Sequence, residues 1–368
     1  MSRKANKARS ITSRDVAALA GVSLMTVSRT LRTPDLVSPA TRQRVEAAAR
    51  ELNYVPDLAA GSLSSQRSGH VAVLLPSLRH AGFLRTVDGL SDTLREHGYH
   101  LLIGDCHYSV EQQLELLRML LGRRPEAIVL ISGLDSPAAQ ELLERAAVPV
   151  IETWHWPDEP RNRVVGFSQF EVGRTMTESL IAMGHTQIGF LGALGPFDPN
   201  GEQRRQGHLA ALQHAGLRDD IQSSVGKAPM EIEDGANGAC QLLDRFPEME
   251  ALACASDMTA LGVLHECRRR HLSVPDQLAI AGFGDFDFAR YLQPSLTSVR
   301  LPSYRIGQQA AELIVATISG ETPAPPSHCN LGFELIHRQS TGHDEQLMTY
   351  ASSAPDAMPT RGVRPHDE

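Results

Sequence analysis

The chain has 368 residues, of which 42% are hydrophobic, 5% aromatic and 21% charged. This length exceeds what one hydrophobic core usually organises, so it predicts a small domain joined to a larger two-lobed one. The composition excludes a disordered or collagenous chain, and no apolar run reaches the roughly 18–20 residues that a membrane-spanning helix needs. The basic residues in 1–10 precede no apolar stretch and do not resemble a signal peptide, so we expect a cytoplasmic protein.

The charge is spread unevenly along the chain. Residues 1–70 contain 11 Lys and Arg against 5 Asp and Glu, whereas the remaining residues contain 24 against 38. The net charges of the two parts are therefore +6 and −14. A basic segment in front of an acidic body predicts that only the first part meets a polyanion such as DNA.

Residues 11–56 have the pattern of three short helices. Thr12 and Asp15 form a predicted capping box for the first helix, and Gly21 is suited to end it. Ser23 is a predicted cap for a second helix over 24–31, and Ser38 with Pro39 starts a third. The apolar positions expected to close a small core between the helices are Val16, Leu19, Ala20, Val27, Leu31, Val45, Ala48, Ala49 and Leu52. The turn over 20–23 has helix-turn-helix length.

The outer face of the second helix carries Leu24, Met25, Thr26, Ser28 and Arg29. An arginine can donate two hydrogen bonds to guanine in the major groove, apolar side chains can meet thymine methyl groups, and hydroxyls suit phosphates. Taken singly, Arg29 could equally be a solvated charge and Met25 a core residue. The basic charge and the helix spacing together favour DNA contact.

The segment 57–69 is a predicted hinge and linker. A helix over 58–65 would be weak because of Gly61 and several serines, and it would need a partner chain and the DNA minor groove to form, with Leu63 as an apolar wedge between base steps. The alternative is a flexible linker.

The body, 70–340, alternates strands with helices. Short apolar runs that predict strands buried on both faces occur at 71–75, 101–103, 127–131, 148–151, 188–191, 251–254 and 278–281. This pattern predicts a doubly wound α/β fold in two lobes, with ligand loops at the carboxyl ends of the strands. Those loops are 76–83, 104–107, 152–156, 192–205, 255–257 and 283–287.

No motif for catalysis is present in the sequence. The chain has no G-x-G-x-x-G, P-loop or G-x-S-x-G sequence, and the pair Asp285 and Asp287 is more typical of solvated or capping carboxylates. The five cysteines are widely spaced without a Cys-x-x-Cys pair, which disfavours disulfides and structural zinc. We expect no enzyme activity, no metal and no cofactor.

Several stretches together resemble the LacI/GalR family of transcriptional regulators. In the first domain they are 11–17 (ITSRDVA), 20–29 (AGVSLMTVSR), 37–42 (VSPATR) and 52–56 (LNYVP). In the body they are 184–188 (GHTQI), 257–262 (DMTALG), 274–276 (VPD), 281–283 (AGF) and 294–299 (PSLTSV). The resemblance covers residues 11–340. It implies a homodimer whose two helix-turn-helix domains read a palindromic operator, and a body shaped like a periplasmic sugar-binding protein.

Within the family, 24–29, 73–78 (VLLPSL), 165–167 (VGF) and 283–284 look most like repressors of gluconate utilisation. The resemblance implies that Leu24, Met25 and Arg29 read bases and that Leu63 enters the minor groove. It also implies that four hydroxyl residues lie near DNA phosphates, namely Thr12, Ser23, Thr26 and Ser28. The family's effector-contacting positions would be occupied by Ser77, Phe83, Trp154, Phe167, Arg204, Ser256 and Gly284.

Three positions depart from the family pattern. Gly61 replaces the usual Arg or Gln of the hinge, Ser256 replaces the Asn of an Asn-Asp pair, and Gly284 replaces an Asp. A buried carboxylate would repel an anionic ligand, so its loss at Gly284 suits a sugar acid. Arg204 would then bind the ligand carboxylate, with Ser77, Ser256 and His155 binding hydroxyls. Without the family comparison, Gly284 is more simply a turn residue.

These observations predict a repressor of sugar-acid genes that is released by gluconate, while 2-ketogluconate, idonate and a neutral sugar remain open as effectors. Closure of the lobes would separate the hinges and lower operator affinity, although the sequence leaves the sign of the response open. The polar residues 341–368 predict a disordered tail without a tetramerising heptad. A sugar-acid-binding carrier and a sugar-acid enzyme are the alternatives from other classes.

Overall fold

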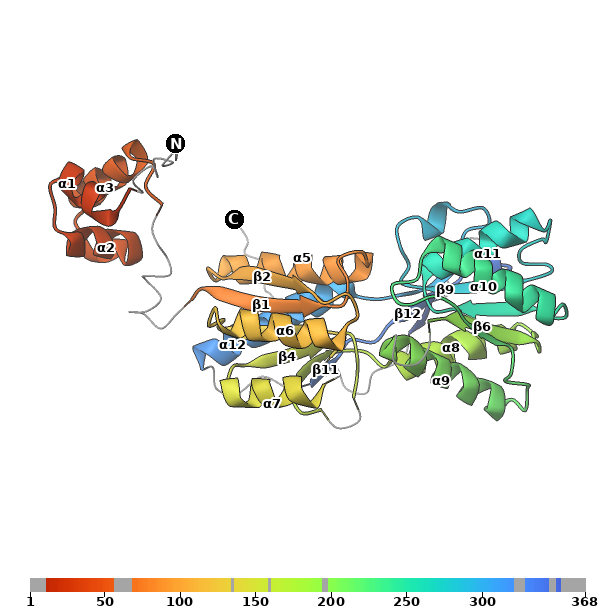
Figure 1. The fold of residues 1–368 in the computed structure, drawn as a ribbon. Helices are drawn as coiled ribbons and strands as arrows, with labels where there is room; N and C mark the ends of the chain where they lie inside the picture. Colours follow the sequence, from red (N-terminus) through yellow and green to blue (C-terminus); the bar gives the residue numbers. More distant parts are fainter. Residues whose placement is uncertain are drawn as a thin grey trace, which may run out of the picture. The chain divides into compact units, whose positions relative to one another are not determined.

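The structure, a computed structural model, describes residues 11–55, 68–133, 136–157, 160–193, 198–320, 328–343 and 349–351. The chain divides into two compact units, residues 1–68, here called the head, and residues 69–368, here called the body (Figure 1). Among the described residues, no helix is both long and apolar enough to cross a membrane.

Within residues 11–55 the head forms three α-helices, and the sequence signals that begin them are confirmed. The helices are α1 (Ser13–Ala20), α2 (Leu24–Arg32) and α3 (Pro39–Glu51), with a short 3-10 helix, η1 (Pro34–Leu36), between the last two. The Asp15 carboxylate accepts hydrogen bonds from the backbone N–H of Thr12 at 2.8 Å and from its hydroxyl at 2.7 Å. Ser23 caps α2 and Ser38 caps α3 through their hydroxyl oxygens. Gly21 ends α1 with a φ of 64°.

The small core of the head differs in part from the predicted one. Its buried members are Val16, Ala17, Ala20, Val27, Val45 and Ala48, with Ala49 and Leu52 packed at its edge. Leu19 is 48% exposed and Leu31 is 37% exposed, so their predicted burial is wrong. The buried face of α1 is centred between Val16 and Ala17, which places Leu19 at its flank. Thr30 is buried on α2, and its hydroxyl is satisfied there because it donates to the Thr26 carbonyl oxygen.

The N-terminal lobe of the body is a parallel sheet between two helical layers. Its strand order is β11-β5-β4-β3-β1-β2. The strands are β1 (His70–Leu75), β2 (His100–Asp105), β3 (Ala127–Ile131), β4 (Val150–Thr153), β5 (Arg163–Gly166) and β11 (His328–Asn330). The helices α5 (Ala81–Glu96) and α12 (Ser303–Ser319) pack together on one face. On the other face lie α6 (Val110–Leu121) and α7 (Pro137–Ala146).

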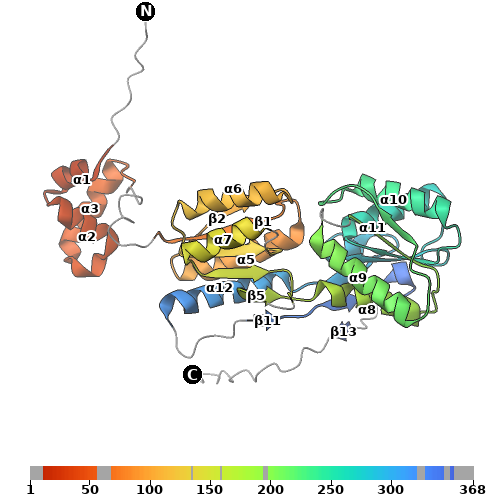
Figure 2. The same cartoon turned by 60° about the horizontal axis from the view of Figure 1, so that its bottom comes forward.

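The C-terminal lobe repeats this plan with an antiparallel edge. Its strand order is β13-β12-β10-β9-β8-β6-β7. The strands are β6 (Ile188–Gly192), β7 (Gln222–Ser224), β8 (Ala251–Cys254), β9 (Ala279–Phe283), β10 (Thr297–Arg300), β12 (Glu334–Ile336) and β13 (Thr349–Ala351). Figure 2 shows α8 (Gln169–Ala182) and α9 (Pro199–His214) on one side, and α10 (Ile232–Arg245) and α11 (Asp257–Arg269) on the other. Two short 3-10 helices complete the lobe, η3 (Ala289–Tyr291) and η4 (Gln339–Thr341).

The predicted doubly wound α/β architecture is confirmed, and each of the seven apolar runs coincides with a strand in whole or in part. Strand β4 begins at Val150 rather than at 148, and β9 begins at Ala279 rather than at 278. Strand β3 is buried at every residue, as the continuous apolar run predicts. The chain passes between the lobes after β5, β10 and β11. Because the parallel strands of each lobe end at one edge of their sheet, this connectivity brings loops from both lobes to a common cleft.

Residues just past 340 are part of the C-terminal lobe. Thr341 is buried, and its hydroxyl lies 2.7 Å from the Thr297 hydroxyl. Residues 349–351 form β13, which pairs antiparallel with β12. The described structure therefore extends beyond Thr341, the residue at which the sequence predicts a disordered tail to begin. The prediction for 344–348 and 352–368 lies outside the described residues.

Candidate functional site

The predicted DNA-contacting residues of the head lie on its surface. Met25 is 69% exposed and Leu24 44% exposed, and Ser28 and Arg29 are exposed beside them. The side chains of Thr12 and Ser23 are exposed at the starts of α1 and α2, while Thr26 is half-buried. The predicted minor-groove residue, Leu63, lies outside the described residues. Helix α2 thus presents apolar, hydroxyl and guanidinium groups together.

A cavity in the body lies between the two lobes, at the carboxyl ends of strands from both sheets. Its volume is about 110 Å³, which restricts its occupant to a small molecule. The N-terminal lobe contributes side chains that follow β1, β2, β3 and β4, namely Arg79, His80, Phe83, Tyr108, Ser132 and Trp154. The polar groups of the C-terminal lobe come from Gln169, Asp198, Asn200, Arg204, Glu231 and Ser256. Phe283 and Phe286 complete the apolar lining.

Aromatic rings form one wall of the cavity. The rings of His80 and Phe83 stack with centroids 4.2 Å apart, and Phe83 meets Trp154 edge-on at 4.7 Å. Burial, together with the charge of Arg204, lowers the pKa of His80 to about 4, so the imidazole is neutral at pH 7. These rings offer apolar faces to a ligand without adding charge.

Trp154 links this wall to the polar part of the cavity. Its indole N–H donates to Thr86 Oγ1 at 2.9 Å, and its carbonyl oxygen accepts from Gln169 Nε2 at 2.8 Å. Its backbone φ is 69°, a left-handed conformation that is costly for a bulky residue. Such conformations persist where surrounding contacts enforce them, most often at functional sites.

Arg204, on α9, is the central charge of the cavity. It is 5% exposed, and its guanidinium carbon lies 4.2 Å above the Phe283 ring. Its Nη1 donates to Gln169 Oε1 at 2.5 Å, and its Nη2 lies 3.5 Å from Asp198 Oδ2. Its Nε has no hydrogen-bond partner among the described residues. A buried guanidinium with an unused N–H is suited to a ligand carboxylate.

The cavity contains a buried carboxylate to which the sequence analysis assigned no role. Asp198, at the N-terminus of α9, lies beside Arg204, although Gly284 does replace the acidic residue of the family pattern. Burial raises the pKa of Asp198 and lowers that of Arg204, while the attraction between the two charges opposes both shifts. The buried arginine charge is therefore partly compensated before any ligand binds.

The structure places four of the predicted effector residues in the cavity wall and four outside it. Phe83, Trp154, Arg204 and Ser256 line the cavity. The other four are Ser77, His155, Phe167 and Gly284. The Ser77 hydroxyl is buried and accepts the N–H of Arg79, and His155 Nε2 lies 2.8 Å from Glu152 Oε2. The Phe167 ring is fully buried behind Trp154, with centroids 5.8 Å apart.

Gly284 is required by the backbone. Its φ is 121°, and a Cβ atom at this position would lie 2.6 Å from the Phe286 ring. This φ lies in the region that glycine alone adopts freely. Gly284 therefore shapes the loop that carries Phe283 and Phe286 into the cavity.

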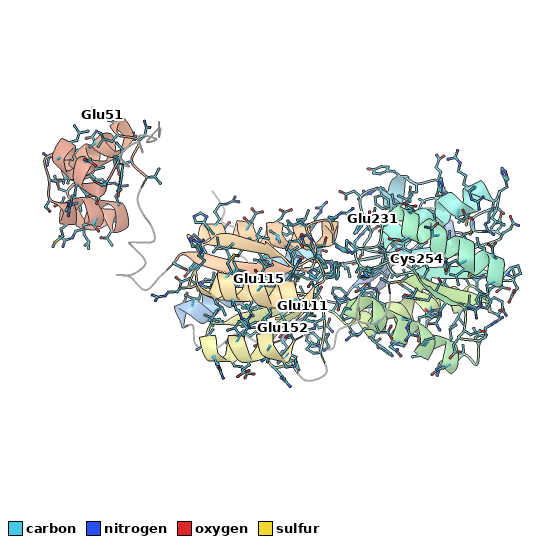
Figure 3. All side chains as sticks on the ribbon, viewed as in Figure 1. Glu51, Glu111, Glu115, Glu152, Glu231 and Cys254 are labelled. Carbon is cyan, nitrogen blue, oxygen red and sulfur yellow. The ribbon has the colours of Figure 1, made fainter. Side chains whose placement is uncertain are left out.

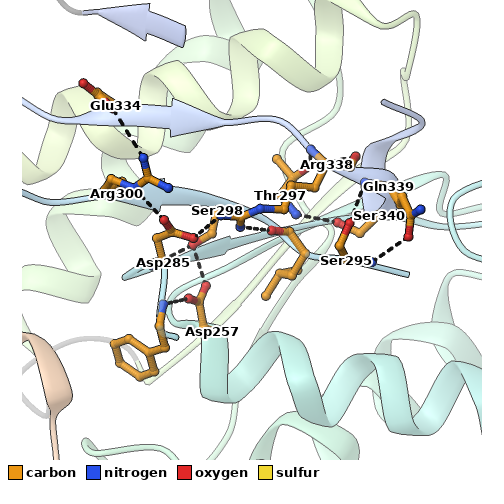
Figure 4. Close-up of polar contacts among 12 residues, drawn as sticks. Asp257, Asp285, Ser295, Thr297, Ser298, Arg300, Glu334, Arg338, Gln339 and Ser340 are labelled. Atoms are coloured by element: carbon orange, nitrogen blue, oxygen red, sulfur yellow. Dashed lines mark hydrogen bonds and ion pairs between the residues drawn. The ribbon is translucent and has the colours of Figure 1, made fainter. Parts of the chain in front are cut away.

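A network of buried charges supports that loop (Figure 4). Asp257 accepts the N–H of Phe286 at 2.7 Å and the Ser298 hydroxyl at 2.6 Å, and burial raises its pKa to about 7. Asp285 forms ion pairs with Arg338 at 2.6 Å and Arg300 at 2.7 Å. The interpretation of Asp285 as a solvated or capping residue is wrong, because two arginines compensate its burial.

Two ion pairs join the lobes beside the cavity. Arg79 pairs with Glu231, which Figure 3 shows on the side of the C-terminal lobe that faces the N-terminal lobe. Arg85 lies 3.4 Å from Asp287. Both pairs are largely exposed, so each contributes little to stability by itself. Their geometry nevertheless depends on how far the lobes are closed.

Sequence reasoning assigned no role to eight polar residues of the cavity, namely Arg79, His80, Tyr108, Ser132, Gln169, Asp198, Asn200 and Glu231. The range 192–205 included Asp198 among the loops to inspect, but its role was not assigned. Ser132 follows the predicted strand 127–131 and could have been found by applying the strand-end rule there as well. Tyr108 lies one residue beyond an inspected loop. Gln169 lies on a helix, where no sequence signal distinguished it.

Comparisons with known proteins agree with both units. Residues 12–57 match the family model described as bacterial regulatory proteins, lacI family, and residues 177–341 match a periplasmic binding protein-like domain. The HTH-type transcriptional regulator GntR of Pseudomonas aeruginosa is 35% identical over 327 residues, which cover 89% of this chain and 94% of that protein.

Solved structures show the same relationship. The transcription regulator GntR from Chromobacterium violaceum is 36% identical, with a TM-score of 0.70 over 74% of this chain and 100% of that one. The lac repressor dimer bound to operator and the anti-inducer ONPF is 25% identical, with a TM-score of 0.79 over 90% of this chain and 99% of that one.

Proposed function

Because the chain belongs to the LacI family of DNA-binding transcriptional regulators, we propose that it represses sugar-acid catabolism genes and is released from its operator by gluconate. In this proposal it acts in the cytoplasm as a homodimer on a palindromic operator. The observation that carries the effector assignment is the buried guanidinium of Arg204, whose Nε–H has no partner among the described residues that surround it. The likeness of 24–29, 73–78, 165–167 and 283–284 to gluconate-utilisation repressors supports it.

On the DNA side, α2 enters the major groove. Arg29 donates two hydrogen bonds to a guanine, while Leu24 and Met25 contact thymine methyl groups. Phosphates are held near the starts of α1 and α2 by Thr12, Ser23, Thr26 and Ser28. The Ser23 hydroxyl oxygen already accepts the Thr26 N–H, so these two residues approach the phosphate as one preformed unit. Leu63 enters the minor groove in the operator complex.

On the ligand side, the carboxylate of gluconate binds at the Nε edge of Arg204. Two unit charges 4 Å apart interact by about 4 kcal/mol at an effective dielectric constant near 20. A ligand carboxylate midway between Arg204 and Asp198 would therefore be attracted by one and repelled by the other almost equally. The ligand carboxylate therefore lies on the side of Arg204 away from Asp198. The carboxylate of Asp198 then accepts ligand hydroxyls, and Ser256 contributes a further hydroxyl contact.

Effector binding is coupled to DNA binding through the lobes. A ligand that contacts both lobes favours the state in which they are closed. The hinge then loses the arrangement that the operator requires, and a tenfold loss of operator affinity needs only about 1.4 kcal/mol of differential binding. The pairs Arg79–Glu231 and Arg85–Asp287 change with this motion because each joins one lobe to the other.

A gel-shift experiment with promoter fragments tests the proposal. The protein should retard a palindromic operator fragment, and gluconate should reverse the retardation. Retardation that gluconate strengthens would make the protein a co-repressor-dependent regulator. Calorimetry with gluconate, 2-ketogluconate, idonate and glucose identifies the effector, and binding of glucose alone would contradict the sugar-acid assignment.

A further inference from the structure

A second chamber adjoins the cavity on its N-terminal-lobe side. Its volume is about 250 Å³, and it is lined by the ends of β1, β2 and β3, the start of α6 and the start of α9. Four residues line both spaces, namely Tyr108, Ser132, Asp198 and Asn200. The two chambers therefore lie side by side and share the wall that these residues form.

Two residues that line the second chamber carry buried polar atoms with no hydrogen-bond partner among the described residues. Gln113 is 8% exposed, and its Nε2 donates to the Gly133 carbonyl oxygen at 3.2 Å, while its Oε1 is buried without a hydrogen bond. The Ser132 hydroxyl is buried and unpaired in the same way. A buried acceptor left unpaired costs about 1–3 kcal/mol, so a ligand that supplies a donor recovers a substantial free energy.

The electrostatic character of this chamber differs from that of the first. Its only charged lining residue within the described structure is Asp198, whereas the first cavity contains Arg204. Neutral hydroxyl groups can donate to Gln113 Oε1 and to the Asp198 carboxylate. A phosphate group would meet a carboxylate and no cation, which is unfavourable in a buried site.

We propose that the cleft binds an open-chain polyhydroxy acid that spans both chambers, with its carboxylate at Arg204 and an unphosphorylated hydroxyl tail at Ser132 and Gln113. This inference rests on the proposed function, because it takes the carboxylate at Arg204 as one end of the ligand. It adds that Gln113 and Ser132 select for chain length and against a terminal phosphate. A compact pyranose ring fills the first chamber and leaves Gln113 unpaired.

Calorimetry on the full chain tests this inference with three acids: gluconate, the three-carbon acid glycerate, and 6-phosphogluconate. The wild type should bind gluconate at least about tenfold more tightly than either of the others, since each loses the contacts of the tail. Gln113→Met removes the acceptor at similar volume and should weaken gluconate about tenfold while leaving glycerate unchanged. The exposed neighbour supplies the control variant, Gln112→Ala.

A second variant keeps the test valid if Gln113→Met folds poorly. Val110 lines only the second chamber and is 38% exposed, so Val110→Phe fills space there without breaking a buried contact. It should weaken gluconate and spare glycerate. Equal effects of Val110→Phe on both acids, or 6-phosphogluconate binding as tightly as gluconate, would overturn the two-chamber ligand and leave the proposed function intact. Failure of every acid to bind the wild type would reject the proposed function itself.

Discussion

The head and the cleft present their functional side chains in opposite ways. In the head, Met25 is 69% exposed and takes no part in the small core. In the cleft, Arg204 is 5% exposed and is held by Gln169, Asp198 and Phe283. Recognition by the head is therefore separable from its stability, whereas binding by the cleft and stability of the body depend on the same contacts.

The largest effect is expected from Arg204→Ala. The substitution removes the proposed carboxylate partner, so gluconate binding should become undetectable by calorimetry. It also removes the contacts that Asp198 and Gln169 Oε1 make with Arg204, and the free energy of unfolding of the body should fall by about 2–4 kcal/mol. A gluconate heat signature identical to that of the wild type would reject the carboxylate role.

Arg29→Ala tests the opposite arrangement in the head. Losing a bidentate contact to guanine costs about 1–3 kcal/mol, so preference for the operator over scrambled DNA should fall by about 10- to 100-fold. Unfolding and ligand binding should not change. The control Arg50→Ala removes one head charge in the last turn of α3. If selectivity survives Arg29→Ala, α2 does not read bases through this residue.

The sequence predicts the exposed functional side chains of the head more completely than the buried ones of the cleft. In the head, the caps at Thr12, Ser23 and Ser38 and the exposed face of α2 follow from local patterns, because a short helix has one buried face and one exposed face. Only flanking positions such as Leu19 and Leu31 were misplaced. In the body, seven of the described strands, and the edge at which ligand loops are expected, follow from apolar runs of sequence.

The side-chain geometry of the cleft could not be predicted in this way. The wall residues come from the segments after several different strands, and the direction of each side chain depends on tertiary contacts. His155 follows Trp154 immediately, yet it lies against Glu152 while Trp154 lines the cavity. Asp198 gave no local signal of its pairing with Arg204, because the two residues are six positions apart and their burial depends on other segments that pack around them.

A smaller effect is expected on the pH dependence of stability, which should differ between the body, where His208 is buried, and the head. This residue is fully buried on α9, with Nδ1 2.9 Å from Thr177 Oγ1, and burial lowers its pKa from 6.5 to about 3. The unfolded chain binds a proton below pH 6.5 and the folded chain does not, so stability falls as the pH falls from 6.5 toward 3. The slope is at most about 1.4 kcal/mol per pH unit.

His208→Phe should remove that contribution because phenylalanine does not titrate. The Thr177 hydroxyl keeps a partner in the variant, since it also donates to the Gly173 carbonyl oxygen. Denaturant unfolding of the body at pH 7.5 and 5.5 measures it as the difference between the slopes of wild type and variant. The head has no histidine in residues 11–55 and should show no such slope in this range. Identical slopes for the two proteins would mean that His208 is protonated in the folded state.

The smallest effect is expected from Leu19→Ser, which tests the corrected core of the head. Leu19 is 48% exposed at the flank of α1, so the substitution should change the free energy of unfolding by less than about 0.5 kcal/mol. The matched variant Val16→Ala creates a cavity at a fully buried position and should cost about 1–3 kcal/mol. Thermal unfolding of the head measures both. A loss for Leu19→Ser as large as for Val16→Ala would show that Leu19 is covered in solution, either by the head itself or by a second protomer. Recognition and stability would then no longer be separable on that face of the head.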